Sequence, residues 1–130
     1  MKPIHSPGKR KTAIAKATLS KGSGKVFVNR TPLELVQPEQ ARLRISEPLR
    51  LAGDKIKNLN IKVKMIGGGF QSQAEAARLA IARSLVKLDK TLKSTFLNYD
   101  RHLLIADVRR KEQRKPNDSK ARSKRQKSYR

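Results

Sequence analysis

GGGFQSQAEAARLAIARSLVKL, residues 67–88, sets three glycines directly before a long helical pattern. The apolar residues of this pattern recur near one helical face, at Ala77, Ile81, Leu85 and Leu88. Ser72 and Glu75 have the spacing of a capping box at the start of a helix. The stretch therefore predicts a glycine turn followed by a long amphipathic helix.

The glycines Gly67–Gly69 expose backbone N–H groups in front of the positive end of a helix dipole, where an anion can bind. Their spacing is not that of a dinucleotide-binding loop, and a close strand-to-helix turn without a ligand is an equally good interpretation. In either case we expect Gly68 or Gly69 to adopt a conformation that a side chain would block, or to let the backbone of a bound polyanion approach closely.

Two stretches alternate as half-buried strands do. Residues 58–66, NLNIKVKMI, present Leu59, Ile61, Val63 and Met65 on one face and the polar Asn60, Lys62 and Lys64 on the other. Residues 11–19, KTAIAKATL, place Ala13, Ala15, Ala17 and Leu19 opposite Thr12, Lys16 and Thr18. We expect two strands, of which the first has a basic outer face and the second has small residues that allow close packing.

Other elements follow from turn and capping signals. The turn residues 20–25 before VFV, residues 26–28, predict a hairpin. Within it, GSGK lacks the further glycine and the hydroxyl residue of a phosphate-binding loop, so we interpret it as a turn. A short helix capped by Thr31 and a second helix from Pro38 to Pro48 are expected. Thr91–Tyr99 predicts a third helix, and Leu103–Val108 predicts a last buried strand.

These elements predict an α/β (α+β) two-layer sandwich, with a mixed sheet of about four strands and helices on one face. We expect one globular domain over residues 1–108, which begins with a short basic arm over residues 1–10. Residues 109–130 contain eleven Lys or Arg against two carboxylates and almost nothing apolar, so they predict an extended basic tail that needs a partner to become ordered.

Charge is the dominant compositional feature. The chain has 130 residues and a net charge of +22, which favours a polyanionic partner. It has no cysteine, which excludes disulfides and thiolate metal sites. No apolar run is long enough to span a bilayer and the start lacks a secretory signal, so we expect a cytoplasmic protein that does not engage a membrane.

No group of residues predicts catalysis. His5 and His102 lie far apart in the sequence, and neither has a nucleophile beside it. Asp100 and Asp107 are expected to cap elements or to pair with arginines. We expect no enzyme, no cofactor, no metal and no small-molecule substrate. Aromatic residues are only 4% of the chain, which argues against a base-stacking sheet and favours recognition of phosphate and shape in structured RNA or duplex.

Four blocks resemble a known family. GKRKTAIAKATL near the start, GGGFQSQAEAARLAIARSL, YDRHLLIADVRR and the final QKSYR are similar to the universal small-subunit ribosomal protein nine family. The last two blocks and the short start resemble its archaeal type. Residues 115–125, KPNDSKARSKR, depart from the glycine-rich stretch that this branch usually has there. That departure bears on the path of the tail and not on its end point.

The resemblance implies a left-handed βαβ crossover and a place in the head of the small ribosomal subunit, with ribosomal RNA and neighbouring head proteins as partners. It also implies that the C-terminal tail reaches the anticodon stem-loop of the transfer RNA in the peptidyl site. The residues expected to contact that transfer RNA are Lys127, Ser128, Tyr129 and Arg130.

Ribosomal RNA is expected to contact three groups of residues. The first two groups lie near the start of the chain and around the glycine turn: Lys9, Arg10, Lys11, Lys21, Lys25, Gly67, Gly68, Gly69, Gln73 and Arg83. The third group lies in the tail: Arg109, Arg110, Lys111, Arg114, Lys115, Lys120, Arg122, Lys124 and Arg125.

Composition alone leaves two other interpretations. A free nucleic-acid-compacting protein of chromatin type would bind DNA and RNA alike. An enzyme with a phosphate-bearing substrate at Gly67–Gly69 would show turnover that one substitution abolishes. A third question concerns the tail, which could neutralise RNA along its whole length with no special role for its tip.

Overall fold

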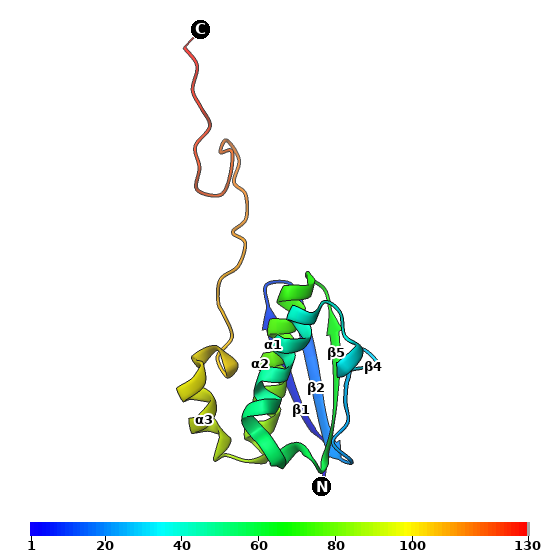
Figure 1. The fold of residues 1–130 in the computed structure, drawn as a ribbon. Helices are drawn as coiled ribbons and strands as arrows, with labels where there is room; N and C mark the ends of the chain where they lie inside the picture. Colours follow the sequence, from blue (N-terminus) through cyan, green and yellow to red (C-terminus); the bar gives the residue numbers. More distant parts are fainter. Residues whose placement is uncertain (130) are drawn as a thin grey trace.

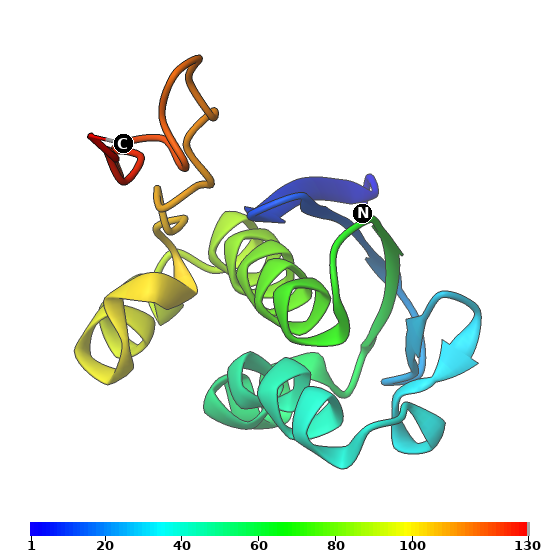
Figure 2. The ribbon, with the colours of Figure 1, turned by 90° about the horizontal axis from the view of Figure 1, so that it is seen from above.

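The structure is a computed structural model that describes residues 1–129. One mixed sheet is covered on one face by two long helices, and a third helix lies beside them (Figures 1 and 2). The elements are β1 (Ile4–Arg10), β2 (Ala13–Lys21), β3 (Val26–Val28), β4 (Thr31–Pro32), η1 (Leu33–Leu35), α1 (Glu39–Ala52), η2 (Gly53–Ile56), β5 (Leu59–Ile66), α2 (Phe70–Leu88), α3 (Leu92–Tyr99) and η3 (Arg101–Leu103).

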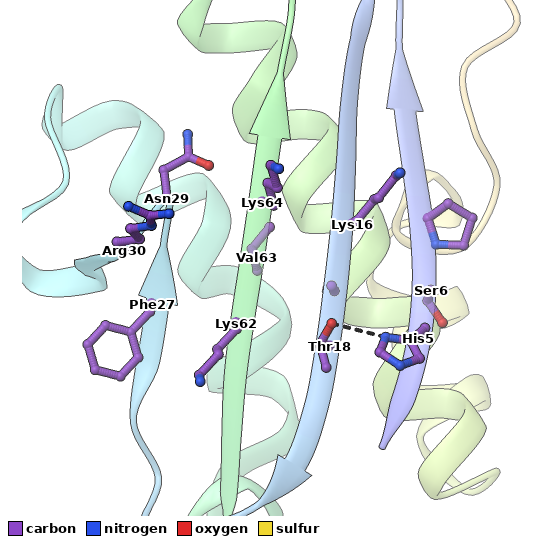
Figure 3. Close-up of a pocket in the computed structure, with 12 residues that line it drawn as sticks. His5, Ser6, Lys16, Thr18, Phe27, Asn29, Arg30, Lys62, Val63 and Lys64 are labelled. Atoms are coloured by element: carbon purple, nitrogen blue, oxygen red, sulfur yellow. Dashed lines mark hydrogen bonds between the residues drawn. The ribbon is translucent and has the colours of Figure 1, made fainter. Parts of the chain in front are cut away.

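The five strands lie in the order β1-β2-β5-β3-β4. β2 is antiparallel to both β1 and β5, whereas β3 is parallel to β5. β3 and β5 are joined through α1, which makes a βαβ unit. In Figure 3 both β3 and β5 run upward, with the helices behind them and β3 to the left of β5, so the crossover is left-handed. The α+β sandwich expected from the sequence patterns and the left-handed unit that the family resemblance implies are both confirmed.

The strands over residues 11–19 and 58–66 are confirmed as β2 and β5. Ala13, Ala15 and Ala17 are buried on β2, and Ile61 and Val63 are buried on β5. Their alternation was a reliable signal because each strand has one face on the helices and the other in solvent.

The expected hairpin between β2 and β3 is wrong, because β5 lies between these strands. The turn over residues 22–25 therefore leads across the end of β5. Asn60 of β5 holds it there, since its Oδ1 accepts hydrogen bonds from Ser23 N (3.0 Å) and Lys25 N (3.2 Å). The turn itself was predicted correctly. However, β2 pairs with β5, a strand more than thirty residues further along the chain, and not with β3.

The expected N-terminal arm is also different in the structure, where Ile4–Arg10 forms the edge strand β1. Ser6 and Gly8 face the helices, and their small size conceals the alternation that marks a strand. A Cβ atom on Gly8 would lie 2.0 Å from the carbonyl oxygen of Ala76, so only glycine lets β1 lie this close to α2.

Two helix boundaries differ from expectation. Thr31–Pro32 pairs with β3 as the short strand β4, and only the single turn η1 follows, with no side-chain cap. α1 continues through Pro48 to Ala52. The Pro48 side chain is buried, so its packing compensates for the missing N–H. The helix ends at Gly53, whose φ is +57°.

The last strand expected over Leu103–Val108 is wrong. Residues 101–103 form η3, and the chain then continues without regular structure. The free edge of β1 is closed to another strand because Pro7 has no N–H and α2 side chains bind the edge carbonyls. Lys87 Nζ donates to His5 O (2.8 Å), and Arg83 donates to Pro7 O (3.2 Å) and, through Nε, to Leu104 O (3.0 Å).

α3 spans Leu92–Tyr99 as expected, and Phe96 and Leu103 anchor this region in the core. A buried arginine connects it to the two long helices. Arg78 of α2 is 3% exposed. Its Nε lies 2.6 Å from a Glu47 carboxylate oxygen of α1, and its second amino group donates to Asp100 at 2.8 Å.

Burial opposes the charge on Arg78, but the hydrogen bond to Asp100 and the charges of Glu47, Asp100 and Glu75 raise its pKa above the ordinary value. Burial likewise opposes ionisation of Asp100, yet hydrogen bonds from His102 N and Arg78 lower its pKa. The ionised cluster is therefore the stable form, and it joins α1, α2 and the segment after α3.

Replacing Arg78 by methionine should destabilise the protein by about 3 to 5 kcal/mol, because three carboxylates would lose their buried cation. Urea unfolding followed by circular dichroism measures the change. Arg44→Met is the matched control, since Arg44 is half exposed and its ion pair with Glu75 should contribute at most about 1 kcal/mol. Equal losses in the two variants would contradict the role assigned to Arg78.

Candidate nucleic-acid interface

The glycine turn joins β5 to α2 and packs against the turn between β1 and β2. Gly67 and Gly68 have φ values of +73° and +65°. A Cβ atom on Gly67 would lie 2.8 Å from Thr12 O, and one on Gly68 would lie 2.9 Å from the Ala13 Cβ. The expectation for Gly68 is thus confirmed, whereas Gly69 has an ordinary φ and open space around it.

The predicted capping box at Ser72 and Glu75 is not formed. Gly69 is the N-cap of α2 and no side chain caps the helix. Glu75 instead pairs with Arg44 at 3.1 Å. Gln73 closes the turn, because its Nε2 donates to Gly67 O at 3.0 Å. The first N–H groups of α2 consequently have no side-chain partner.

Cations from the start of the chain lie beside this turn. Arg10 and Lys11 line a small hollow of about 270 Å³ together with Phe70 and Ser72 of α2. Arg10 is partly committed elsewhere, since it pairs with Asp107 at 3.3 Å. Lys9 and Lys11 are exposed. The structure therefore brings Lys11 and the helix N-terminus together, as an anion site would require.

Lys21 and Lys25 lie at the other end of the sheet. Lys21 is the last residue of β2 and pairs with Leu59, whereas Ile14 at its start pairs with Ile66 next to the glycine turn. At about 3.3 Å per residue, the nine residues of β2 separate the two ends by roughly 27 Å. The structure does not bring these lysines together with the glycine turn.

Arg83 is occupied within the domain. Its hydrogen bonds to Pro7 O and Leu104 O hold the edge strand and the segment after η3. Arg83 was expected to contact ribosomal RNA, and it lies in the block that resembles the family. The structure gives this residue a local role that the sequence did not indicate.

The tail begins at a fixed point. Arg109 donates to Asp107 from its backbone N (2.9 Å) and from its guanidinium (2.7 Å). These hydrogen bonds, followed by the charge of Arg10, lower the pKa of Asp107 well below its ordinary value. Asp107 thereby ties the first tail residue to the edge strand. Both expected aspartates, Asp100 and Asp107, do pair with arginines.

Beyond this point, the described part of the tail extends away from the domain (Figure 1). Two carboxylates organise one loop of it. Glu112 pairs with Arg122 (2.7 Å) and with Lys115 (3.4 Å), and Asp118 pairs with Lys124 (3.3 Å).

The other cations expected to bind RNA are exposed on the described tail, at Arg110, Lys111, Arg114, Lys120, Arg125 and Lys127. Tyr129 is 96% exposed. Arg130, expected to contact transfer RNA, lies outside the described residues. The structure thus presents a row of cations and a terminal aromatic ring to solvent.

A second basic surface was not among the predicted sites. Lys16 of β2 and Lys62 and Lys64 of β5 point outward from the sheet face that carries no helices (Figure 3). With Arg30 and Phe27 they line a shallow hollow of about 1100 Å³. The alternation already assigned these lysines to the outer strand faces, but only the sheet order places them side by side.

Two groups of features are absent from residues 1–129. These residues contain no group of three or more His, Cys, Asp or Glu that could hold a metal ion. No helix in this range is both long and apolar enough to span a membrane. His5 has a local partner, because its Nδ1 lies 3.0 Å from the Thr18 hydroxyl.

The fold and its exposed cations define a strongly basic α+β protein with a basic C-terminal extension. A family model described as ribosomal protein S9/S16 matches residues 8–130. The chain is also 46% identical to the small ribosomal subunit protein uS9 of two strains of Methanococcus maripaludis and 45% identical to that of Methanococcus vannielii, over the full length of each.

The chain therefore belongs to the ribosomal protein S9/S16 family and is of the archaeal type. It is a ribosomal protein of the small-subunit kind, a component of a ribonucleoprotein that takes part in translation in the cytoplasm. Its role is structural, so the interpretation as a phosphate-processing enzyme loses its support.

The glycine turn gives a sharp test because two neighbours have opposite environments. Gly68→Val should destabilise the protein by about 2 kcal/mol, since a branched side chain resists a positive φ and would meet Ala13. Gly69→Val, with φ of −89° and free space, should cost less than about 1 kcal/mol. Gly68→Val should therefore have a lower free energy of unfolding in urea than Gly69→Val, and it should enter small subunits less efficiently. If Gly68→Val has normal stability and assembles normally, the glycine turn is a loop that tolerates side chains and does not require glycine.

Proposed function

We propose that this protein binds ribosomal RNA in the head of the small subunit and reaches the peptidyl-site transfer RNA with the tip of its tail. The observation that carries the proposal is the family match, which extends through the tail to residue 130. The proposed partners are small-subunit ribosomal RNA, that transfer RNA and neighbouring head proteins. We also propose that residues 1–108 act as the RNA-binding domain and residues 109–130 as the tail.

Charge supports the RNA-binding half of the proposal. Within residues 1–129, nine of the ten Asp and Glu side chains pair with arginines or lysines, and Glu34 makes no ion pair in this range. Because there are only ten carboxylates for 32 Lys and Arg, most cations remain available for phosphate. Lysines and arginines placed on phosphates release counterions, which drives association.

The transfer RNA half rests on the geometry of the tail. Asp107 fixes its first residue to the domain, and the 22 residues after position 108 can span roughly 70 Å when extended. Exposed cations along it would neutralise a path through RNA. At the tip, Tyr129 can pack on a sugar or base, and Lys127 and Arg130 can approach phosphate.

A sucrose gradient of cell lysate distinguishes the proposed ribosomal role from that of a free nucleic-acid-compacting protein. A ribosomal component should co-migrate with small subunits through a high-salt wash. A chromatin-type protein should leave the particles and bind DNA and RNA equally.

Affinity for purified small-subunit ribosomal RNA should fall steeply with salt. Each phosphate neutralised in duplex contributes about −0.9 to the slope of log K against log salt, so several contacts should give a slope of about −5 or steeper. Filter binding between 50 and 300 mM salt measures it. A flat line would contradict the electrostatic mode of binding.

Removal of Ser128–Arg130 tests the tip. Because the buried core of the domain ends at Leu103 and because Ser128 and Tyr129 are exposed, folding and subunit incorporation should remain near those of the parent. Dissociation of initiator transfer RNA from the peptidyl site should accelerate roughly tenfold, as expected for the loss of about 1.4 kcal/mol of contact. The control is a variant that lacks the loop residues 116–121 but keeps the tip, which separates the effect of a shorter tail from the loss of the tip residues. If subunits that contain the truncated protein bind and release transfer RNA at unchanged rates, the tip has no special role. The tail would then only neutralise RNA charge along its length.

A further inference from the structure

The sheet face without helices carries a broad hollow of about 1100 Å³. It extends from β1 to β3, and its floor includes the backbone around Ala17 and Val63. No described helix or strand covers it, as Figure 2 shows. Four cations line it: Lys16, Lys62, Lys64 and Arg30. None of the residues that line it is an Asp or a Glu.

These cations repel one another. Lys16 and Lys64 are direct cross-strand partners in the antiparallel pair of β2 and β5, which places their Cβ atoms about 5 Å apart. Lys62 lies two residues before Lys64 and so points to the same side of the sheet. Like charges in this arrangement destabilise a strand pair unless an anion lies between them.

The protein supplies no such anion. Within residues 1–129, the four cations make neither an ion pair nor a side-chain hydrogen bond. Carboxylates elsewhere in the domain pair with other cations, for example Glu75 with Arg44 and Arg78, and Asp107 with Arg10 and Arg109. The repulsion is therefore left for a partner to relieve.

We propose that this sheet face is a second RNA-binding surface, on which the sugar-phosphate backbone lies across β2 and β5 with phosphates on Lys16, Lys62 and Lys64. The proposal rests on the proposed function and names a surface for it. Arg30 extends the row beyond β3, and Phe27 offers its ring to a sugar or an unpaired base at that side (Figure 3). Flexible lysines act as point charges, which suits contacts to phosphate independent of sequence.

An acidic protein segment is the competing occupant. Protein interfaces are enriched in aromatic residues, Met and Arg and are depleted in Lys. This face has three lysines, one arginine and one aromatic ring among the side chains that line it. Its composition therefore favours nucleic acid.

The test compares two variants of equal charge. The face variant carries Lys16→Gln, Lys62→Gln and Lys64→Gln. The control variant carries Lys57→Gln, Lys90→Gln and Lys93→Gln, which are exposed lysines outside the hollow. Filter binding to purified small-subunit ribosomal RNA across a salt series gives the slope of log K against log salt. Thermal unfolding checks that both variants fold.

The face variant should reduce the magnitude of that slope by about 2 to 3, since each lost phosphate contact removes about 0.9 in duplex or 0.7 in single strand. The control should reduce it by less than 1. Equal slopes in the two variants would overturn the sheet-face proposal while leaving the proposed function intact. Failure of the parent protein itself to bind ribosomal RNA would instead contradict the proposed function.

A second measurement identifies the occupant in the assembled particle. Phe27 is replaced by the photoreactive p-benzoylphenylalanine, the protein is reconstituted into small subunits, and the crosslinked product is digested with ribonuclease or protease. A crosslink to ribosomal RNA supports the proposal. A crosslink to a neighbouring protein overturns it. So does a yield of RNA crosslink that is no higher than the yield from p-benzoylphenylalanine placed at position 90 instead.

Discussion

The close approach of α2 to β1 and β2 is the contact on which the rest of the structure depends. Gly8 lets the edge strand pass against the backbone of Ala76, and three of the four buried side chains of β2 are alanines, at Ala13, Ala15 and Ala17. Small residues on both elements permit dense packing, which a larger side chain would disrupt. Because α2 lies so near the sheet, Arg83 and Lys87 can reach the carbonyls of β1.

This packing also distributes charge between the two faces of the sheet. The helices on one face bring Glu47, Glu75 and Asp100 to the buried Arg78, and the edge of that layer gives Asp107 to two arginines. These carboxylates therefore form ion pairs on the helix side of the sheet. The opposite face and the tail are left with unpaired cations, so a strongly basic protein becomes basic on particular surfaces.

The sequence by itself determined the elements whose patterns are local. The alternation in β2 and β5 and the periodicity of α2 were sufficient because each has one buried and one exposed side. The positive φ of Gly68 followed from a strand-to-helix turn. Net charge was readable from composition, and the motif blocks pointed to the family that the chain belongs to.

Only the tertiary structure decided which strands are neighbours and which cations are free. β1 was hidden in the sequence because Pro7 and Gly8 break the pattern, yet both suit an edge strand on a closely packed helix. The predicted strand after His102 failed because Arg83 and Lys87 bind the β1 edge. Lys16 and Lys64 lie nearly fifty residues apart in the chain, and their repulsion exists only because β5 inserts between β2 and β3. Such facts depend on contacts between distant segments, which no local pattern encodes.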